Sequence, residues 1–408
     1  MLSEDAIEKL VRPIVDRQEA INRFVIDIIA QRIKDIGSLT ASDIYKLERL
    51  FQRGADVRKI NQEIARLTGL QVNDIKKLIR EVALDSYIDV KSYFDYRHKP
   101  FIPLDENIAL NRVITAIQKV TVDEYINMSK AQAFMLRDLK NPKRLIATPL
   151  AKAYQTVIDE AIQTVQSGTV DYYSAMRRTM KQLNESGIRY VVYSPESGKR
   201  YTQRLDTAVR RNLLDGVRAI NQGVQDEVGK QFGADGKEIT VHANSAPDHE
   251  PIQGHQFTNE EFNKLQNGEP FMDVKGNHFN PIERAIGTLN CRHFTYSIII
   301  GVEKPNFTQE QLDAYIAKNN KGYTDSKGNH YTMYQCTQIQ RQLETKVRKA
   351  KDGQIMAKTA GDMELAKEYQ AKINKYTKQY QTFSKACGLS PKSNKMRVSG
   401  YKKISINS

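Results

Sequence analysis

The chain has 408 residues, of which 62 are Lys or Arg and 48 are Asp or Glu, so its formal net charge is +14. At roughly 100–200 residues per domain, it is long enough for two or three domains with sizeable cores, and it has no run of about 18 apolar residues that could span a membrane. Its three widely separated cysteines exclude a disulfide-stapled scaffold and suit assembly in a reducing cell, and its acidic, amphipathic start is not a secretory signal.

The first part of the chain is predicted to be helical. Apolar residues spaced near 3.6 predict one long helix that ends at Gly37, and residues 40–43 are predicted to cap a second helix that ends at Gly54. More helix is expected as far as Tyr96, with a break at Gly69, because glycine is a poor helix former.

Two threonines indicate further helix starts. Thr121 and Glu124 have the spacing of a capping box, in which each side chain bonds a free amide group of the first turn. Thr148-Pro149 predicts another start, with Pro at the first helical position. A strand of β-branched and aromatic residues is then expected at 190–193, after a domain boundary near residue 187.

The central part of the chain is predicted to be a compact α+β domain. A long helix over about 203–232 is followed by strands near 238–242 and 294–300. Between them, a capping box and a hydrophobic staple predict a short helix over 257–266, and a hairpin turn is expected at 274–278.

The last part of the chain is predicted to be a helical hairpin. The tetrapeptide Lys-Gly-Asn-His occurs at 275–278 and again at 327–330, which indicates two similar β-hairpins. Two amphipathic helices follow with a turn at Gly361, and the chain is expected to fray from Gly388.

The predicted class is therefore α+β and predominantly helical, in three parts. A helical region covers 1–187, the α+β domain covers 188–304, and a basic helical hairpin with a flexible tail covers 305–408.

Five of the seven histidines lie between residues 242 and 296. His249 and His255 are separated by five residues, a spacing found in zinc sites, and Cys291 and His293 would face the same side of a strand. These four side chains are candidate ligands for a structural zinc ion, with Asp248 able to supply an oxygen or to hydrogen bond to a ligand. Alternatively, the polar side chains only fix an irregular loop by hydrogen bonding.

A hydrolytic site is a second alternative for this loop. A histidine could act as general base and Arg292 as a phosphate clamp. The sequence offers no cysteine pairs of the HNH type, no carboxylate cluster for magnesium and no glycine-rich phosphate loop. We therefore predict no catalytic residues.

The positive charge is concentrated near the end of the chain. Residues 341–403 contain 16 Lys or Arg against 5 Asp or Glu, and such a segment attracts phosphate backbones without reading base sequence. An ordinary solvated helical face would show the same excess. The candidate contact residues are Lys346, Arg348, Lys349, Lys351, Lys372, Lys375 and Lys378.

Three segments carry a resemblance to a known family. The sequence HANSAPDHEPIQG at 242–254, with Leu-Asn-Cys-Arg-His at 289–293 and a further segment at 331–344, resembles the phage minor capsid protein 2 family. More distantly, the chain is similar to Mu-type phage head-morphogenesis proteins, which usually have a second Cys at the position of His293.

The resemblance implies a structural minor capsid or head-morphogenesis protein of a tailed bacteriophage. Such a protein would be made in the bacterial cytoplasm and lie in the virion, at the capsid interior or portal vertex, and act in procapsid assembly, DNA packaging or ejection. The implied partners are the portal protein and the major capsid or scaffold proteins. The basic hairpin would contact double-stranded DNA or the inner capsid wall. No membrane partner is expected. The alternative is a virion-delivered enzyme, a nuclease or toxin-like transferase, that uses the His-rich loop.

Overall fold

The computed structural model describes residues 4–37, 48–138, 141, 143–166, 172–193, 200–273, 276–288 and 291–406. Helices make up most of it, together with a few small antiparallel sheets, so the predicted α+β, predominantly helical class is confirmed. None of the helices in these ranges is both long and apolar enough to cross a membrane.

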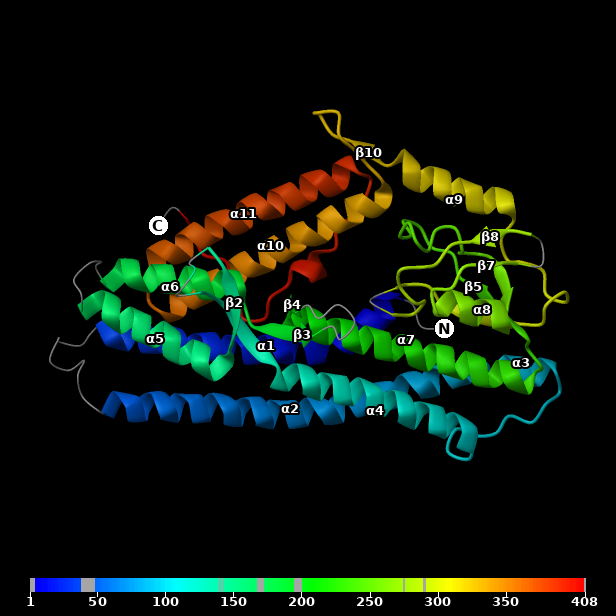
Figure 1. The fold of residues 1–408 in the computed structure, drawn as a ribbon, viewed down its shortest axis with the longest axis horizontal. Coiled ribbons are helices and arrows are strands. Elements are labelled where there is room, and N and C mark those ends of the chain that lie inside the picture. Colours follow the sequence, from blue (N-terminus) through cyan, green and yellow to red (C-terminus); the bar gives the residue numbers. More distant parts are fainter. Residues whose placement is uncertain are drawn as a thin grey trace.

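Six long helices run roughly along the longest dimension of the molecule (Figure 1). They are α1 (Glu4–Gly37), α2 (Glu48–Asp89), α4 (Ile108–Lys130), α7 (Leu205–Gln231), α10 (Met333–Thr359) and α11 (Met363–Ala386). α1 packs on α2, α7 and α10, and α7 also packs on α2 and α4, so α1 and α7 form the centre of the bundle. The shorter helices are α3 (Lys91–Tyr96), α5 (Leu150–Gln166), α6 (Tyr172–Ser186), α8 (Asn259–Gln266) and α9 (Gln309–Lys321).

The strands form small antiparallel sheets beside these helices. One sheet has the order β2-β1-β3-β4, from β1 (Gln132–Arg137), β2 (Leu145–Pro149), β3 (Arg189–Tyr193) and β4 (Arg200–Arg204). A second, β6-β5-β9, packs on α7 through β9 and consists of β5 (Gly236–Ile239), β6 (Gln256–Thr258) and β9 (Thr295–Ile298). Two hairpins pair β7 (Phe271–Met272) with β8 (His278–Phe279), and β10 (Tyr323–Thr324) with β11 (His330–Tyr331).

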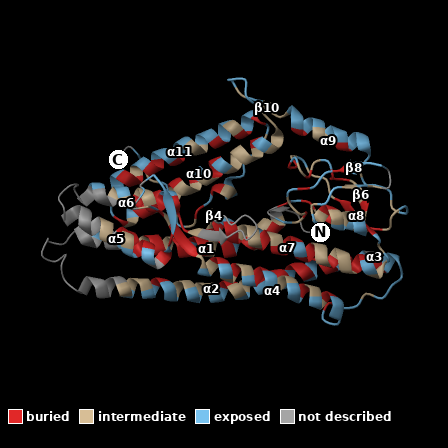
Figure 2. Cartoon of the chain, in the orientation of Figure 1, coloured by how far each residue is buried: buried red, intermediate tan, exposed pale blue. Residues whose placement is uncertain are grey.

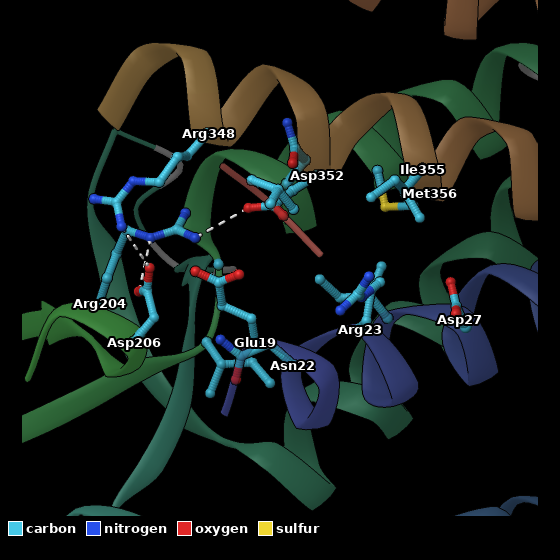
Figure 3. Close-up of a pocket in the computed structure, with 15 residues that line it drawn as sticks. Glu19, Asn22, Arg23, Asp27, Arg204, Asp206, Arg348, Asp352, Ile355 and Met356 are labelled. Atoms are coloured by element: carbon cyan, nitrogen blue, oxygen red, sulfur yellow. Dashed lines mark hydrogen bonds and ion pairs between the residues drawn. The ribbon is translucent and has the colours of Figure 1, made fainter. Parts of the chain in front are cut away.

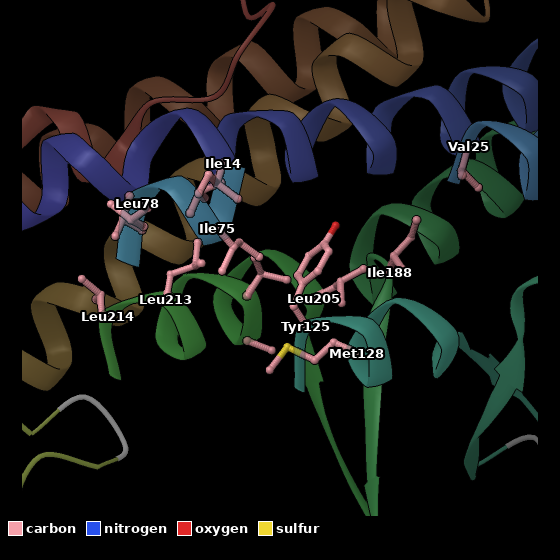
Figure 4. Close-up of a cluster of buried hydrophobic side chains, with 14 of the residues drawn as sticks. Ile14, Val25, Ile75, Leu78, Tyr125, Met128, Ile188, Leu205, Leu213 and Leu214 are labelled. Atoms are coloured by element: carbon pink, nitrogen blue, oxygen red, sulfur yellow. The ribbon is translucent and has the colours of Figure 1, made fainter. Parts of the chain in front are cut away.

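One large hydrophobic core includes residues from all three predicted parts of the chain. Ile75 of α2, Tyr125 of α4 and Leu213 of α7 lie close together at its centre (Figure 4), and Val347 of α10 belongs to the same cluster. The buried residues line the contacts between helices, whereas the outer sides of α2 and α11 are largely exposed (Figure 2). The division at 187/188 and 304/305 stays a prediction, but the parts share this core.

Several local predictions are confirmed. The described residues 4–37 form one long helix, α1, and Thr258 caps α8 in a capping box with Glu261. The described residues 276–278 of the first Lys-Gly-Asn-His segment and the whole of the second lie in hairpins, and Gly361, with φ of 78°, makes the turn between α10 and α11.

Other local predictions are wrong because packing outweighs weak local signals. Gly54 and Gly69 both lie inside the continuous helix α2. Thr121 lies inside α4, where its hydroxyl donates to the carbonyl of Ile117 at 2.9 Å instead of capping. The helix predicted to start at Thr148-Pro149 is present as α5, which begins one residue later because Pro149 ends β2. The predicted cap at 40–43 lies outside the described residues.

The end of the chain is ordered, contrary to the prediction of fraying from Gly388. Met396 and Val398 are buried. The Gln370 side-chain oxygen accepts hydrogen bonds from the Tyr401 hydroxyl at 3.0 Å and from the Ile404 amide at 3.1 Å. The tail is therefore held against the α10–α11 hairpin.

A group of buried charges connects α1, the start of α7 and α10 (Figure 3). Arg204 donates to Asp206 at 3.2 Å and to Asp352 at 3.1 Å, and Arg348 donates to Asp206 at 3.4 Å. Glu19 of α1 lies beside these groups, and its side chain is only 9% exposed. We call these five residues the buried charge cluster.

Glu19 is the member of this cluster whose negative charge is least balanced by nearby positive charges. Burial raises its pKa from 4.5 to about 7, and the nearby carboxylates Asp206 and Asp352 add to the shift, while Arg12 opposes it. Glu19 therefore takes up its proton more readily in the folded protein than in the unfolded chain.

We predict that this residue makes the protein less stable as the pH rises. Between pH 4.5 and 7 the folded state binds more protons than the unfolded state. The stabilisation by protonated Glu19 is therefore complete below pH 4.5 and is lost as the pH rises through 7. Between pH 5 and pH 8, the free energy of unfolding of the wild type should fall by about 2–3 kcal/mol more than that of Glu19→Gln, whose side chain stays neutral. Urea unfolding at each pH measures both. Glu364→Gln, exposed on α11, should retain the wild-type pH dependence, and equal slopes for Glu19→Gln and wild type would contradict the prediction.

Two helical glycines form a matched pair for testing the packing of the bundle. A Cβ on Gly353 of α10 would lie 2.5 Å from the ring of Tyr369 on α11, whereas a Cβ on Gly69 of α2 would meet nothing within 4 Å. We predict that Gly353→Ala destabilises the protein by about 1–3 kcal/mol through overpacking. Gly69→Ala should stabilise it by about 0.5–1 kcal/mol through helix propensity. Chemical denaturation checks both signs, and a stabilising Gly353→Ala would show that the helices separate easily at this point.

Candidate metal centre

Three of the histidines in the His-rich region, His242, His249 and His255, lie in the loop that connects β5 to β6 of the β6-β5-β9 sheet, which we call the central sheet. The Gly254 amide donates to the Ile239 carbonyl at 2.8 Å, and the Ile239 amide donates to the His255 carbonyl at 3.1 Å, which closes the loop at its base. Gly254 has a φ of 74°, and a Cβ there would lie 2.5 Å from Leu312, so this position requires glycine. The loop therefore returns to the sheet over a tightly packed turn.

Three of the four predicted ligands lie together. His249 Nδ1 is 3.3 Å from Cys291 Sγ, and His293 Nδ1 is 3.5 Å from the same sulfur. The three side chains are buried, and one ligand atom from each lies within 4.8 Å of the others. Cys291 and His293 precede β9 instead of lying on it, yet both side chains face His249.

The outer ring nitrogens of both histidines have oxygen partners. His249 Nε2 lies 2.7 Å from the carbonyl oxygen of Arg284, whose guanidinium is held by Asp248 at 2.8 and 3.2 Å. His293 Nε2 lies 3.3 Å from the side-chain oxygen of Gln253. Asp248 also lies beside the cluster, with a carboxylate oxygen 3.4 Å from His249 Nε2, and its predicted role as a neighbour of a metal ligand stays a prediction.

The surroundings keep His293 neutral. Burial, with the nearby His242, His249 and Arg284, lowers its pKa to about 2. Burial acts to raise the pKa of Cys291 and to lower that of His249, but their mutual hydrogen bond and charge outweigh it, so the pKa of Cys291 lies below its ordinary value and that of His249 above it. The two side chains therefore share one proton, and a metal ion would bind the thiolate and the neutral imidazole once that proton has left.

His255, the fourth predicted ligand, does not belong to this cluster. Its half-buried ring packs against Phe279 at 5.6 Å between centroids and lines a different pocket with His278 and Pro281. Counting residues from His249 could not reveal this, because the turn at Gly254 directs the two histidines to different sides.

The cluster borders a pocket of about 70 Å³ between α10 and the part of the chain that carries the central sheet, from β5 to residue 304, which we call the central segment. His242, whose ring centroid is 4.1 Å from that of His293, lines this pocket with the exposed Arg292, and Tyr334 and Gln338 line it from α10.

The sequence did not reveal the roles of Gln253 and the Arg284 carbonyl, because no spacing rule indicates which oxygens will accept from buried imidazoles. One sulfur and two nitrogen donors can hold a borderline-soft cation such as zinc.

The seven predicted basic contact residues fall into two groups. Lys346, Lys372, Lys375 and Lys378 are exposed. Arg348, Lys349 and Lys351 are engaged within the protein, with Asp206 and with the backbone carbonyls of Glu185 and Met396 respectively, which corrects their placement on a contact surface. Periodicity alone did not separate the two faces of α10.

Comparison with known proteins gives one match. A family model described as phage minor capsid protein 2 matches residues 2–385, nearly the whole chain. No curated protein and no solved structure matches the chain.

Proposed function

The chain belongs to the phage minor capsid protein 2 family and is a structural protein of a bacteriophage virion, and we propose that it lies at the portal vertex and acts in procapsid assembly, DNA packaging or ejection. The observation that carries this proposal is the match over residues 2–385, which takes in the helical bundle, the central sheet and the C-terminal hairpin together. In this proposal the N-terminal helical region docks on the portal or capsid, and the basic hairpin meets DNA or the inner capsid wall.

Two exposed aliphatic residues on α2 support the docking role. Leu84 and Ile88 are 44% and 53% exposed, and at 100° per residue they lie one turn apart on the same side of the helix. We call this pair the apolar stripe. Leu70, which is 45% exposed, lies on the same side about four turns away, with the exposed Lys77 and Glu81 between them. Adjacent exposed aliphatic side chains suit burial against a partner surface.

The outer face of α11 supports the second role. Lys372, Lys375 and Lys378 are exposed there, and no Asp or Glu occurs between Lys372 and Ala386. α11 packs mainly on α10, which leaves its other side accessible (Figure 1). The exposed Glu368 lies one turn before Lys372, but the three lysines outnumber it on this face, which favours contact with a phosphate backbone.

Membership of a capsid protein family favours this structural role over the alternative of a virion-delivered nuclease or transferase. Arg292, the candidate phosphate clamp, lines the pocket beside the His–Cys cluster, but nothing in the geometry of the described residues supplies a reaction.

We predict that purified DNA-filled heads contain a few copies of this chain per particle, at a fixed ratio to the portal protein. Replacing the stripe, with Leu84→Gln and Ile88→Gln together, should lower incorporation several-fold because docking loses apolar contact area. Quantitative mass spectrometry of purified heads measures both ratios.

The matched control replaces two exposed apolar residues of the central segment, Met272 and Val302, with Gln. It should leave incorporation unchanged. Absence of the wild-type chain from heads, with abundance in infected cells, would contradict the virion role, and equal losses in both variants would contradict docking through α2.

We also predict that the lysines of α11 bind DNA without sequence preference. The triple variant Lys372→Gln, Lys375→Gln, Lys378→Gln should bind duplex DNA more weakly, with a dependence of log K on log salt that is flatter by about 1 for each contact removed. The control triple Lys76→Gln, Lys77→Gln, Arg112→Gln changes exposed cations on α2 and α4. Fluorescence anisotropy over a salt series compares them. Equal slopes would exclude DNA and favour the capsid wall.

A further inference from the structure

We propose that His249, Cys291 and His293 bind one zinc ion, with water from the adjoining pocket as the fourth ligand. The inference goes beyond the proposed function and does not depend on it. In a tetrahedral site with Zn–S near 2.3 Å and Zn–N near 2.0–2.1 Å, the sulfur and each nitrogen lie about 3.5 Å apart. The observed distances from Cys291 Sγ to the two Nδ1 atoms, 3.3 and 3.5 Å, agree with that arrangement.

The hydrogen bonds of His249 fix which nitrogen is available. A backbone carbonyl can only accept, so His249 Nε2 carries the proton that it donates to Arg284 at 2.7 Å. In the neutral ring, Nδ1 is then unprotonated and directs its lone pair toward Cys291. Donation of the outer N–H to a carbonyl is the usual support of a histidine that ligates a metal.

Gln253 fixes His293 in the same way. The backbone amide of His242 donates to the Gln253 side-chain oxygen at 3.3 Å, which identifies that atom as the acceptor. His293 Nε2, at 3.3 Å from the same oxygen, must then be the donor. The Nδ1 lone pair of His293 therefore also faces the sulfur.

Two lone pairs thus face one thiol. A neutral thiol has a single proton and satisfies one Nδ1 only, and the other would remain buried without a donor. A cation among the three atoms satisfies both nitrogens and the sulfur together, and its binding releases the thiol proton of Cys291 to solvent.

The donor set selects the type of ion. Calcium and magnesium require oxygen ligands, whereas one thiolate and two imidazoles suit zinc. The pocket of about 70 Å³ borders the three side chains on one side, so water can reach the remaining position. The three ligands would join the loop at 240–254 to the segment that enters β9.

The first test measures zinc bound to the full chain after chelator treatment and re-addition of zinc. Wild type should hold one zinc per chain, and Cys291→Ser and His293→Gln should bind at least about 100-fold more weakly. Gln253→Leu, which removes only the supporting acceptor, should weaken binding by about 10–100-fold. His255→Gln and Cys336→Ser are matched controls and should bind like wild type. A wild-type chain that binds no zinc, or ligand variants equal to the controls, would overturn the proposal.

A second measurement decides the question if the ligand variants do not fold. The double variant Cys336→Ala, Cys387→Ala leaves Cys291 as the only thiol of the chain. On addition of Co²⁺ it should show the visible bands of tetrahedral cobalt and the charge-transfer absorption of a cobalt–thiolate bond. Zinc in equimolar amount should remove both signals. Absence of the charge-transfer band from the folded double variant would overturn the assignment.

Discussion

The buried charge cluster is the constraint on which the helical framework depends. Arg204, at the end of β4, is held between Asp206 of α7 and Asp352 of α10, and Glu19 of α1 lies against them. Removing one partner of such a group leaves an uncompensated buried charge, which costs several kcal/mol. Arg204 and Asp206 are close in the sequence, but Glu19 of α1 and the α10 residues Arg348 and Asp352 are far from them, so the cluster is completed only when three distant parts of the chain meet. The bundle is therefore expected to form cooperatively, with α1 and α10 brought together at the start of α7.

The same constraint determines which positive charges remain available to a partner. The C-terminal part of the chain has a large excess of Lys and Arg, but Arg348 neutralises Asp206, and Lys395 pairs with Glu8, which also pairs with Arg210. Part of the accessible charge lies on the side of α11 that faces away from α10, with the exposed Lys372, Lys375 and Lys378. The composition gives the total charge, but only the packing of α10 shows which of its basic side chains are exposed to a partner.

Sequence patterns predicted what is local and missed what depends on packing. The capping box at Thr258 and the two hairpins were predictable because their hydrogen bonds join residues within a few positions of each other. Gly69 did not break α2, because a glycine penalty of about 1 kcal/mol is small beside the burial of a long helix against α4 and α7. For the candidate site, residue types indicated three members of the cluster, but the exclusion of His255 follows from the turn at Gly254. The supporting oxygens of Gln253 and Arg284 follow from tertiary contacts that no spacing encodes.

The position of the candidate site is determined by two links between the central segment and the bundle. β9 lies so close to α7 that a Cβ on Gly229 would be 2.3 Å from the Ser297 side chain, which couples the sheet to the helix that enters the buried charge cluster. On the other side, the buried Asn319 of α9 donates to Glu250, beside His249, and accepts from the Tyr334 amide at the start of α10. Among its described residues, the central segment has a small core of its own with seven buried apolar residues. Its orientation therefore depends on these links more than on that core.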